Sequence, residues 1–573
     1  METHNCQNCK SDFVIDEDDL LFYQKMQVPK PTFCPFCRHI RRSALISESA
    51  LYKGTCARCK KSLITMHHQD DGYTIYCPKC KHGENWDGRE YGRDYDFSKN
   101  FFEQFFKMFK ETPVISMEQT ETNGEGCEYS NYISGSKNSY LSYGIHGSEN
   151  IFYSKYVFRG TKNCVDCLLI KKNDRCYENV RSYANYDCKF LLESHECVSS
   201  AFLYDCINCA NCFMSSNLRN KSYVFRNKQL TKEEYTKELA SLNLNTYHEQ
   251  TTAKKEFSNL MLSSIHKYAD IKNSSGCTGD FIRHSNNCIK CFGVLDSENL
   301  RNSYIILNTA SENSHDIMFT GQVSDCYEVV YGGKAMTNIK FTKSCGGGSQ
   351  NLEYSANCRN CKDCFGCFGL MRNQYCILNK QYTKEEYDEL VPKIKKHMDE
   401  MPYVDKLGRI YKYGEYFPTE LSPFAYNETL AFEEAPLTKE KALAEGYRWR
   451  DMDAKSYPAT ILSKDLPDSI VDVQDSILNE VIACPNNGDP KTRCTSAFKI
   501  IPDELAFYRL MKLPIPRYCP NCRYYDRLKW KNPFKFWHRK CMNQNCSNEF
   551  ETSYAPERPE IVFCESCYQK EVL

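Results

Sequence analysis

Residues 33–38 read FCPFCR and residues 518–523 read YCPNCR. Each segment carries a Cys-x2-Cys pair followed by residues typical of a helix, and each belongs to a longer series of cysteine pairs. Four pairs at the N-terminal end are separated by 24, 18 and 17 residues, and four pairs at the C-terminal end have the same three separations. The two ends of the chain are therefore copies of one module. The pairs are Cys6/Cys9, Cys34/Cys37, Cys56/Cys59, Cys77/Cys80, Cys484/Cys494, Cys519/Cys522, Cys541/Cys546 and Cys564/Cys567.

These cysteines have the spacing of zinc ligands. Four thiolates complete the tetrahedral shell of Zn²⁺, and a two-residue gap turns both sulfurs of a pair toward one point. Pairing neighbours along the chain predicts four structural zinc ions, with no coordination position open for a substrate. A cross-braced, RING-type arrangement is the alternative, although the 18-residue gap is long for it. The predicted ligand sets are Cys6, Cys9, Cys34, Cys37; Cys56, Cys59, Cys77, Cys80; Cys484, Cys494, Cys519, Cys522; and Cys541, Cys546, Cys564, Cys567.

The two sites within each module are expected to differ. In the first site the second cysteine pair opens a helix, which is the geometry of a treble clef. The second site is expected to be a plain zinc ribbon without a helical continuation. The nine residues between Cys484 and Cys494 make that site the least regular of the four.

Composition limits the class of protein. The 573 residues predict about three to five structural units, and 74 basic residues balance 74 acidic ones. No run of sequence approaches the ~18 apolar residues of a membrane helix, and Met1–Cys6 does not begin a secretory signal. A cytoplasmic location follows as the expectation. In that reducing compartment the 35 cysteines favour metal binding over disulfides.

The middle of the chain shows a different repeat. A motif of Asn or Asp, then Cys or Ser, then an aromatic or aliphatic residue recurs every 12 or 13 residues, as at Asn150, Asn163, Arg175 and Asp187. A short fixed period of this kind is typical of a β-solenoid in which amide side chains stack at the corners. The segment that contains Cys206, Cys209 and Cys212 recurs 152 residues later with Cys358, Cys361, Cys364 and Cys367. We therefore predict two tandem solenoids.

Each solenoid is predicted to close onto a helix. Thr231 and Thr383 are followed three residues later by a Glu, which is the signature of a capping box. The repeat cysteines are interpreted mainly as small buried residues, with metal binding as the alternative. Asp174, Asp187, Asp205 and Asp325 are interpreted as turn residues, so no enzyme site is expected here.

The predicted fold is mainly β with short helices, and two duplicated four-cysteine zinc modules, each a treble clef plus a zinc ribbon, flank two tandem β-solenoids. An aromatic helix at 94–106 is expected to dock the first zinc module onto the repeat. Short helices are expected at 438–446 and 466–482, and a surface linker at 401–436.

The predicted divisions are a double-zinc module at 1–90, a helix and linker at 91–126, solenoid 1 at 127–228, a helical closure at 229–272, solenoid 2 at 273–380, helices and linker at 381–480, and a second double-zinc module at 481–573.

Basic residues gather in both zinc modules. Between Phe507 and Met542 ten basic residues face one acidic residue, and between Lys30 and Lys61 eight face one. Cations beside aromatic rings suit single-stranded nucleic acid, so RNA or a ribonucleoprotein is the favoured partner. The competing interpretations are a scaffold that binds protein through its solenoids and a RING-like ligase adaptor. His67, His68 and His82 are interpreted as surface residues. The candidate nucleic-acid residues are Arg38, Arg41, Arg42, Arg523, Arg527, Lys529, Trp530 and Lys531.

Several segments together resemble a known kind of protein. They are residues 33–38, 91–97 (YGRDYDF), the two NKQ(L/Y)TKEEY closures, 446–450 (GYRWR) and 549–556 (EFETSYAP). In these the chain is similar, over nearly its whole length, to an uncharacterised zinc-ribbon family common in candidate-phyla bacteria. The resemblance implies zinc binding and this architecture, and it implies no established activity.

Overall fold

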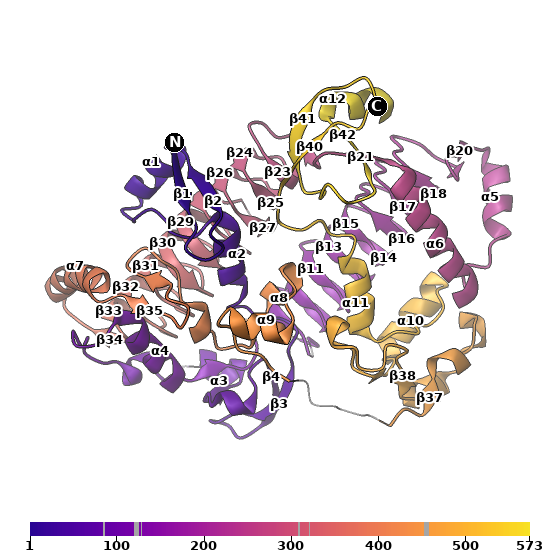
Figure 1. Ribbon diagram of the computed structural model, residues 1–573. Helices are drawn as coiled ribbons and strands as arrows, with labels where there is room; N and C mark the ends of the chain where they lie inside the picture. Colours follow the sequence, from indigo (N-terminus) through magenta and orange to yellow (C-terminus); the bar gives the residue numbers. More distant parts are fainter. Residues whose placement is uncertain are drawn as a thin grey trace. The chain divides into compact units, whose positions relative to one another are not determined.

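The computed structural model describes residues 1–83, 86–119, 125–127, 129–307, 310–319, 321–451 and 458–572. The fold is mainly β with short helices, as predicted (Figure 1). The chain forms two compact units, each made of two separate segments. Unit 1 comprises residues 1–121 and 269–450, and unit 2 comprises residues 122–268 and 451–573. Each unit therefore combines one cysteine-rich end of the chain with one half of the repeated middle.

The helices are short, and no helix in the described ranges is long and apolar enough to cross a membrane. Unit 1 contains α1 (Glu17–Lys25), α2 (Pro35–Ser43), α3 (Pro78–His82), α4 (Phe101–Glu111), α7 (Lys384–Glu400), α8 (Leu430–Glu434) and α9 (Lys439–Ala444). Unit 2 contains α5 (Lys232–Ala240), α6 (Tyr247–Ser263), α10 (Pro502–Met511), α11 (Pro520–Leu528) and α12 (Glu565–Val572).

Parallel strands of the repeated middle form the core of unit 2. Cys164, Cys176 and Cys188 are partners in adjacent strands, so the register advances 12 residues per strand. Only the last pair of this ladder, β19 with β20, is antiparallel. The strands are β7 (Asn131–Ser134), β8 (Lys137–Tyr140), β9 (Tyr143–His146), β10 (Glu149–Phe152), β11 (Lys155–Phe158), β12 (Lys162–Val165), β13 (Leu168–Lys171), β14 (Asp174–Tyr177), β15 (Val180–Tyr183), β16 (Tyr186–Leu192), β17 (Ala201–Tyr204), β18 (Phe213–Ser216), β19 (Val224–Phe225) and β20 (Lys228–Gln229).

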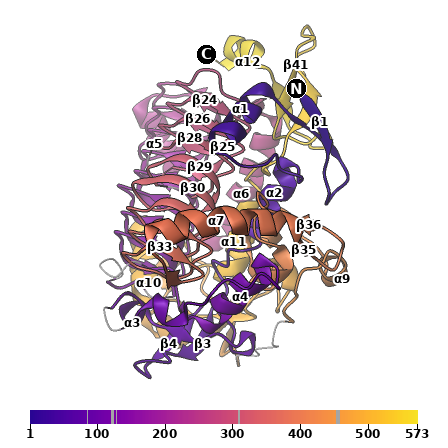
Figure 2. The ribbon, with the colours of Figure 1, turned by 90° about the vertical axis from the view of Figure 1, so that its left-hand side faces the viewer.

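Unit 1 has an equivalent ladder, whose strands lie one above another in Figure 2. They are β22 (Ile271–Lys272), β23 (Gly279–Arg283), β24 (Asn286–Ile289), β25 (Cys291–Leu295), β26 (Glu298–Arg301), β27 (Tyr304–Ile306), β28 (Glu312–His315), β29 (Val323–Val330), β30 (Met336–Lys343), β31 (Gln350–Glu353), β32 (Lys362–Phe365), β33 (Gln374–Ile377) and β34 (Lys380–Gln381). The parallel register is established for both units. That the ladders are two tandem solenoids stays a prediction.

The recurring Asn/Asp positions turn the chain. Asn150, Asn163 and Asp187 have φ near +50°, a region that Asn and Asp tolerate better than most residues. The expected stacking of their side chains is present, since Asn150 Nδ2 donates to Asn163 Oδ1 at 2.8 Å and Asn163 Nδ2 donates to Asp174 Oδ1 at 2.8 Å. The residue after each turn points into the core.

Cysteine and serine have the same role inside the ladders. Cys176 Sγ donates to the carbonyl oxygens of Asp174 and Asn185 at 3.4 and 3.6 Å. Ser182 Oγ makes the same two contacts with Val180 and Leu191. Among the described residues, the only ligand atoms close enough together to hold one metal ion belong to four groups of cysteines near the two ends of the chain. No repeat cysteine is part of these groups. The structure therefore supports the interpretation of the repeat cysteines as small buried residues.

Several local predictions can be compared with the structure. The capping boxes at Thr231 and Thr383 are confirmed, and so is the short helix capped by Thr438. The aromatic helix begins at Phe101, whose ring lies 5.2 Å from that of Tyr354 on the unit 1 ladder. The predicted helix at 466–482 is wrong, because only short 3-10 turns form there.

The segment predicted as a surface linker is also different. Tyr411, Tyr416, Phe417 and Phe424 are all buried. Tyr416 donates a 2.7 Å hydrogen bond to the carbonyl oxygen of Thr342 on β30. The aromatic side chains that lack a clear period in this segment are therefore core residues of unit 1.

Candidate metal centres and the arginine clusters beside them

The eight cysteine pairs converge into four groups of four. In each group all sulfur atoms lie within 4.8 Å of one another. The groups are the ones predicted from neighbouring pairs, and this rules out the cross-braced alternative and the RING-like adaptor that required it. The groups are Cys6, Cys9, Cys34, Cys37; Cys56, Cys59, Cys77, Cys80; Cys484, Cys494, Cys519, Cys522; and Cys541, Cys546, Cys564, Cys567.

The sulfur spacing suits a tetrahedral ion. Four sulfurs at ~2.3 Å from a central Zn²⁺ are about 3.8 Å apart. The sulfurs of Cys9 and Cys34 are 3.7 Å apart, and those of Cys546 and Cys564 are 3.8 Å apart. A disulfide would need ~2.05 Å. The donor set and its size therefore fit four structural metal ions.

Local structure holds the first site of unit 1 in place. The hairpin of β1 (Glu2–Asn5) and β2 (Asp12–Ile15) leads into Cys6, and Lys10 adopts a left-handed conformation that closes the turn back onto Cys6. Cys34 is the N-cap of α2, with Pro35 in the first helical position. The backbone N–H of Cys34 points at Cys6 Sγ at 3.2 Å. Such N–H donors stabilise thiolate charge.

The irregular site of unit 2 has the same arrangement despite its long gap. The nine intervening residues form a compact loop in which the Cys494 N–H donates to the Asp489 carbonyl oxygen at 3.0 Å. Cys519 then opens α11 as Cys34 opens α2. Cys484 and Cys494 are both buried. The extra residues are thus accommodated outside the ligand cluster.

The second site of each unit lies beside another hairpin, β3 (Tyr52–Thr55) with β4 (Ser62–Thr65) and β40 (Trp537–Lys540) with β41 (Glu549–Thr552). Burial disfavours the Cys56 thiolate, but N–H groups of Cys59 and Cys77 outweigh this and lower its pKa to about 6. A helix follows both second sites, α3 and the longer α12, so the expectation of no helical continuation is wrong.

The three candidate arginines of unit 1 are buried against carboxylates. They lie on α2, directly after the Cys34/Cys37 pair, and each is at most 2 % exposed. Arg38 contacts Asp316 at 2.8 Å, and Arg41 contacts Glu328 at 2.8 Å and Glu415 at 2.7 Å. A third guanidinium, that of Arg42, lies 3.2 Å from Asp316 and 3.4 Å from Glu328. Glu328 lies in β29 of the ladder, and Asp316 lies in the turn directly after β28.

Unit 2 repeats this arrangement on α11. Arg523 and Arg527 are buried and contact the two oxygens of Asp166 at 3.0 and 2.8 Å. Glu504 of α10 lies 3.6 Å from Arg523 and accepts hydrogen bonds from Tyr153 and Tyr508. Burial raises the pKa of Glu504 above its ordinary value. The first cysteine group of each unit is thus joined to its ladder by an arginine–carboxylate cluster.

Five of the eight candidate nucleic-acid residues therefore do not lie on an exposed basic face, and this part of the prediction is wrong. The buried carboxylates explain it, and the sequence analysis singled out none of them. Lys529 remains exposed and pairs with Asp526 at 2.8 Å. Trp530 and Lys531 are half-buried, and the Lys531 ammonium lies 3.9 Å from the Phe534 ring centroid.

Two of the three histidines interpreted as surface residues are buried. Burial lowers the pKa of His67 to about 3 and that of His82 to about 4. The His67 ring stacks on Phe424 with centroids 5.3 Å apart. His68 is partly exposed, and its Nδ1 lies 3.1 Å from Arg450.

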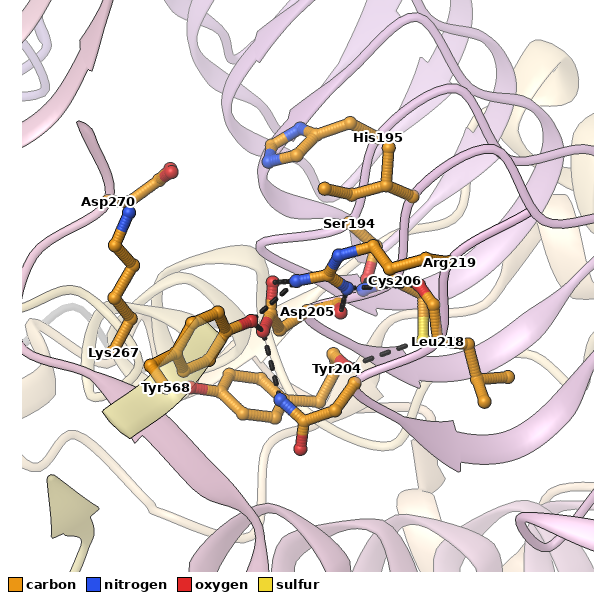
Figure 3. Close-up of polar contacts among 12 residues, drawn as sticks. Ser194, His195, Tyr204, Asp205, Cys206, Leu218, Arg219, Lys267, Asp270 and Tyr568 are labelled. Atoms are coloured by element: carbon orange, nitrogen blue, oxygen red, sulfur yellow. Dashed lines mark hydrogen bonds and ion pairs between the residues drawn. The ribbon is translucent and has the colours of Figure 1, made fainter. Parts of the chain in front are cut away.

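The second cysteine group of unit 2 is also attached to its ladder. β42 (Ile561–Phe563) pairs with β21 (Ile265–Lys267) in parallel. Tyr568 of α12 donates to Asp205, whose other oxygen pairs with Arg219 at 2.9 Å (Figure 3). Asp205 also keeps its predicted place in a turn, with φ of +48°. A turn residue can thus serve as a docking residue as well.

Comparison of the chain with protein-family models, with curated proteins and with solved structures found no match.

Proposed function

We propose that this protein is a non-enzymatic scaffold that holds four structural zinc ions and binds protein partners. The four groups of four cysteines are compatible with metal binding. Zinc is the proposed ion because thiolate ligands in a tetrahedral array favour it over harder cations such as Mg²⁺ and Ca²⁺. Since cysteines would occupy all four coordination positions, the ions would stabilise the modules and supply no reactive water.

The observation that carries this proposal is the use of the arginines. Five of the candidate arginines form ion pairs with carboxylates of their own unit: Arg38, Arg41, Arg42, Arg523 and Arg527. A guanidinium buried in this way cannot pair a phosphate without first leaving the cluster, and breaking such a pair costs about 3–5 kcal/mol. The clusters therefore favour the scaffold over nucleic-acid binding.

We also propose that each ladder is a β-solenoid with four short sides per coil. Between Asp187 and Arg226 every third residue is left-handed, which divides a 12-residue repeat into four sides of three residues. Solenoids offer long, rigid flanks for protein contacts. The zinc modules would then stabilise these flanks by covering part of each ladder.

Two measurements test the proposal on the zinc-loaded protein. Elemental analysis should find about four zinc ions per chain, one for each group. Fluorescence anisotropy with a labelled single-stranded RNA at low and high salt should show no salt-sensitive binding. Tight binding that weakens steeply with salt would overturn the scaffold proposal in favour of RNA. The variant Lys529→Gln/Lys531→Gln would then show whether these two lysines after α11 are responsible.

A further inference from the structure

The duplicated middle of the chain allows the helix that follows the unit 2 ladder, α5, to be compared with the helix that follows the unit 1 ladder, α7. Tyr235 and Leu239 of α5 correspond, at an offset of 152 residues, to Tyr387 and Val391 of α7. The 17-residue α7 crosses its ladder with Val391, Ile394 and Met398 buried (Figure 2). The nine-residue α5 ends at Ala240, so in unit 2 this helix stops where α7 continues. A separate helix, α6, packs on β17 and β18, with the Phe257 ring 5.7 Å from that of Phe202.

A groove lies in unit 2 next to the end of α5. Its volume is about 1480 Å³, and its apolar lining includes Phe202, Leu239, Leu242, Ile470 and Leu513. Val471, at its edge, is 76 % exposed. Two turns of a helix of 10 Å diameter occupy about 850 Å³, and most small-molecule sites are smaller than this groove. The space is thus large enough for a short helix.

The two units differ in charge at this place. Glu353 on β31 of unit 1 holds Lys340 at 3.5 Å and Lys395 of α7 at 2.8 Å. In unit 2 the lysine is kept as Lys189, but Ala201 occupies the position of Glu353. The register supports this equivalence, because Ala201 pairs with Phe213 as Glu353 pairs with Phe365.

The groove consequently carries an excess of positive charge. Its lining includes Lys189, Lys232 and Lys512, and among the described residues none of these forms an ion pair. Lys189 Nζ donates to the Met511 carbonyl oxygen. Arg509 also lines the groove but is paired with Asp475 at 2.7 Å. Asp187 is the one acidic residue of the lining, and it already pairs with Arg175.

The wall formed by α6 contributes a donor that lacks an acceptor. Gln250 is 6 % exposed and lines the groove. Its side-chain amide nitrogen, Nε2, is buried without a hydrogen-bond partner. A buried donor left unsatisfied costs about 1–3 kcal/mol. An occupant that presents a carbonyl or carboxylate oxygen would remove this cost.

We propose that the groove binds an acidic amphipathic helix of a partner protein, about two turns long. Its apolar face would contact the apolar lining of the groove, and its acidic residues would face the lysines. This is the helix-in-groove mode of recognition. The proposal rests on the scaffold function and specifies the partner's contact.

Two labelled peptides test the chemistry. One has the sequence of residues 389–400 of this chain, and the other has Glu in place of its three lysines, Lys393, Lys395 and Lys396. Anisotropy titrations use the zinc-loaded full chain. We expect the acidic peptide to bind at least tenfold more tightly than the native-sequence peptide, whose three lysines balance its three acidic residues. Equal binding of the two peptides, or no binding of either, would overturn the proposal.

Variants locate the binding. Leu239→Glu should lower the affinity for the acidic peptide at least tenfold, because it places a negative charge in the apolar lining of the groove. Ala201→Glu restores the carboxylate seen in unit 1, and it should reduce or reverse the preference for the acidic peptide. The control is Leu443→Glu on α9, an exposed apolar residue outside the groove, which should change nothing. If the groove variants behave like this control, the site is wrong.

The RNA titration and the peptide titrations together separate this proposal from the scaffold function. Salt-sensitive RNA binding refutes the scaffold, whatever the peptides do. Absence of RNA binding together with equal peptide affinities leaves the scaffold intact and refutes only the helix site. Zinc content and the thermal unfolding midpoint of each variant show that it has folded.

Discussion

Removing the carboxylate of Asp166 should destabilise unit 2 strongly. This side chain is fully buried and contacts both Arg523 and Arg527. In Asp166→Ala two buried guanidinium groups lose their shared partner, and breaking a buried pair costs about 3–5 kcal/mol. Because Glu504 still lies 3.6 Å from Arg523, we expect the lower value, about 3 kcal/mol. That corresponds to a roughly 150-fold larger opening constant.

Hydrogen exchange measured by mass spectrometry suits this test, because a chain of two units does not unfold in one step. Peptides from 158–193 report on the unit 2 ladder, and peptides of unit 1 provide an internal reference. Asp187→Ala is the control on the same ladder, since the half-exposed pair of Asp187 with Arg175 should contribute at most about 1 kcal/mol.

Two outcomes would refute the reasoning. Equal loss of protection in Asp166→Ala and Asp187→Ala would mean that the buried cluster contributes no more than a surface pair. A fully protected Asp166→Asn would show that packing rather than charge stabilises the cluster. Asp166→Asn therefore separates the lost charge from the cavity that Ala leaves.

Three further predictions follow from the structure. Cys519→Ser should lower the zinc content from about four ions per chain to about three, since it removes one ligand of a single group; an unchanged content by elemental analysis would contradict the assignment. Cys176→Ser should keep all the zinc and change the unfolding free energy by less than about 1 kcal/mol, because Ser182 already makes the same two hydrogen bonds. A large loss of protection in hydrogen exchange of the unit 2 ladder would show a different role for Cys176. Unit 1 should become less stable as the pH falls below 6.5, because the His67 pKa of about 3 in the folded state means that the unfolded chain binds the proton first. The effect is about 2 kcal/mol at pH 5, and His67→Phe should remove it in hydrogen exchange of unit 1 at pH 5 and pH 8.

The arrangement of the two units bears on all of these tests. Unit 1 joins the first zinc module to the second ladder, and unit 2 joins the first ladder to the second zinc module. A truncation at the boundary between the ladders would therefore separate each module from the ladder that carries its carboxylates. Substitutions in the full chain avoid this separation.

The sequence alone determined the four cysteine groups and the repeat. Cysteine pairs at matching separations led to four groups, and all four form as predicted. The 12-residue motif predicted the register at which Cys164, Cys176 and Cys188 align. Both features depend on local chemistry, because a pair of ligands or one repeat carries its own spacing wherever it lies in the fold.

Tertiary structure decided what the charged residues do. Arg38 and Arg523 follow their cysteine pairs in a pattern that suits phosphate binding, yet Asp316 and Asp166 neutralise them from 278 and 357 residues away along the chain. Nothing in the spacing of the arginines reveals those partners. Pairing between distant residues depends on which module packs on which ladder, and that is a property of the folded chain rather than of any local segment.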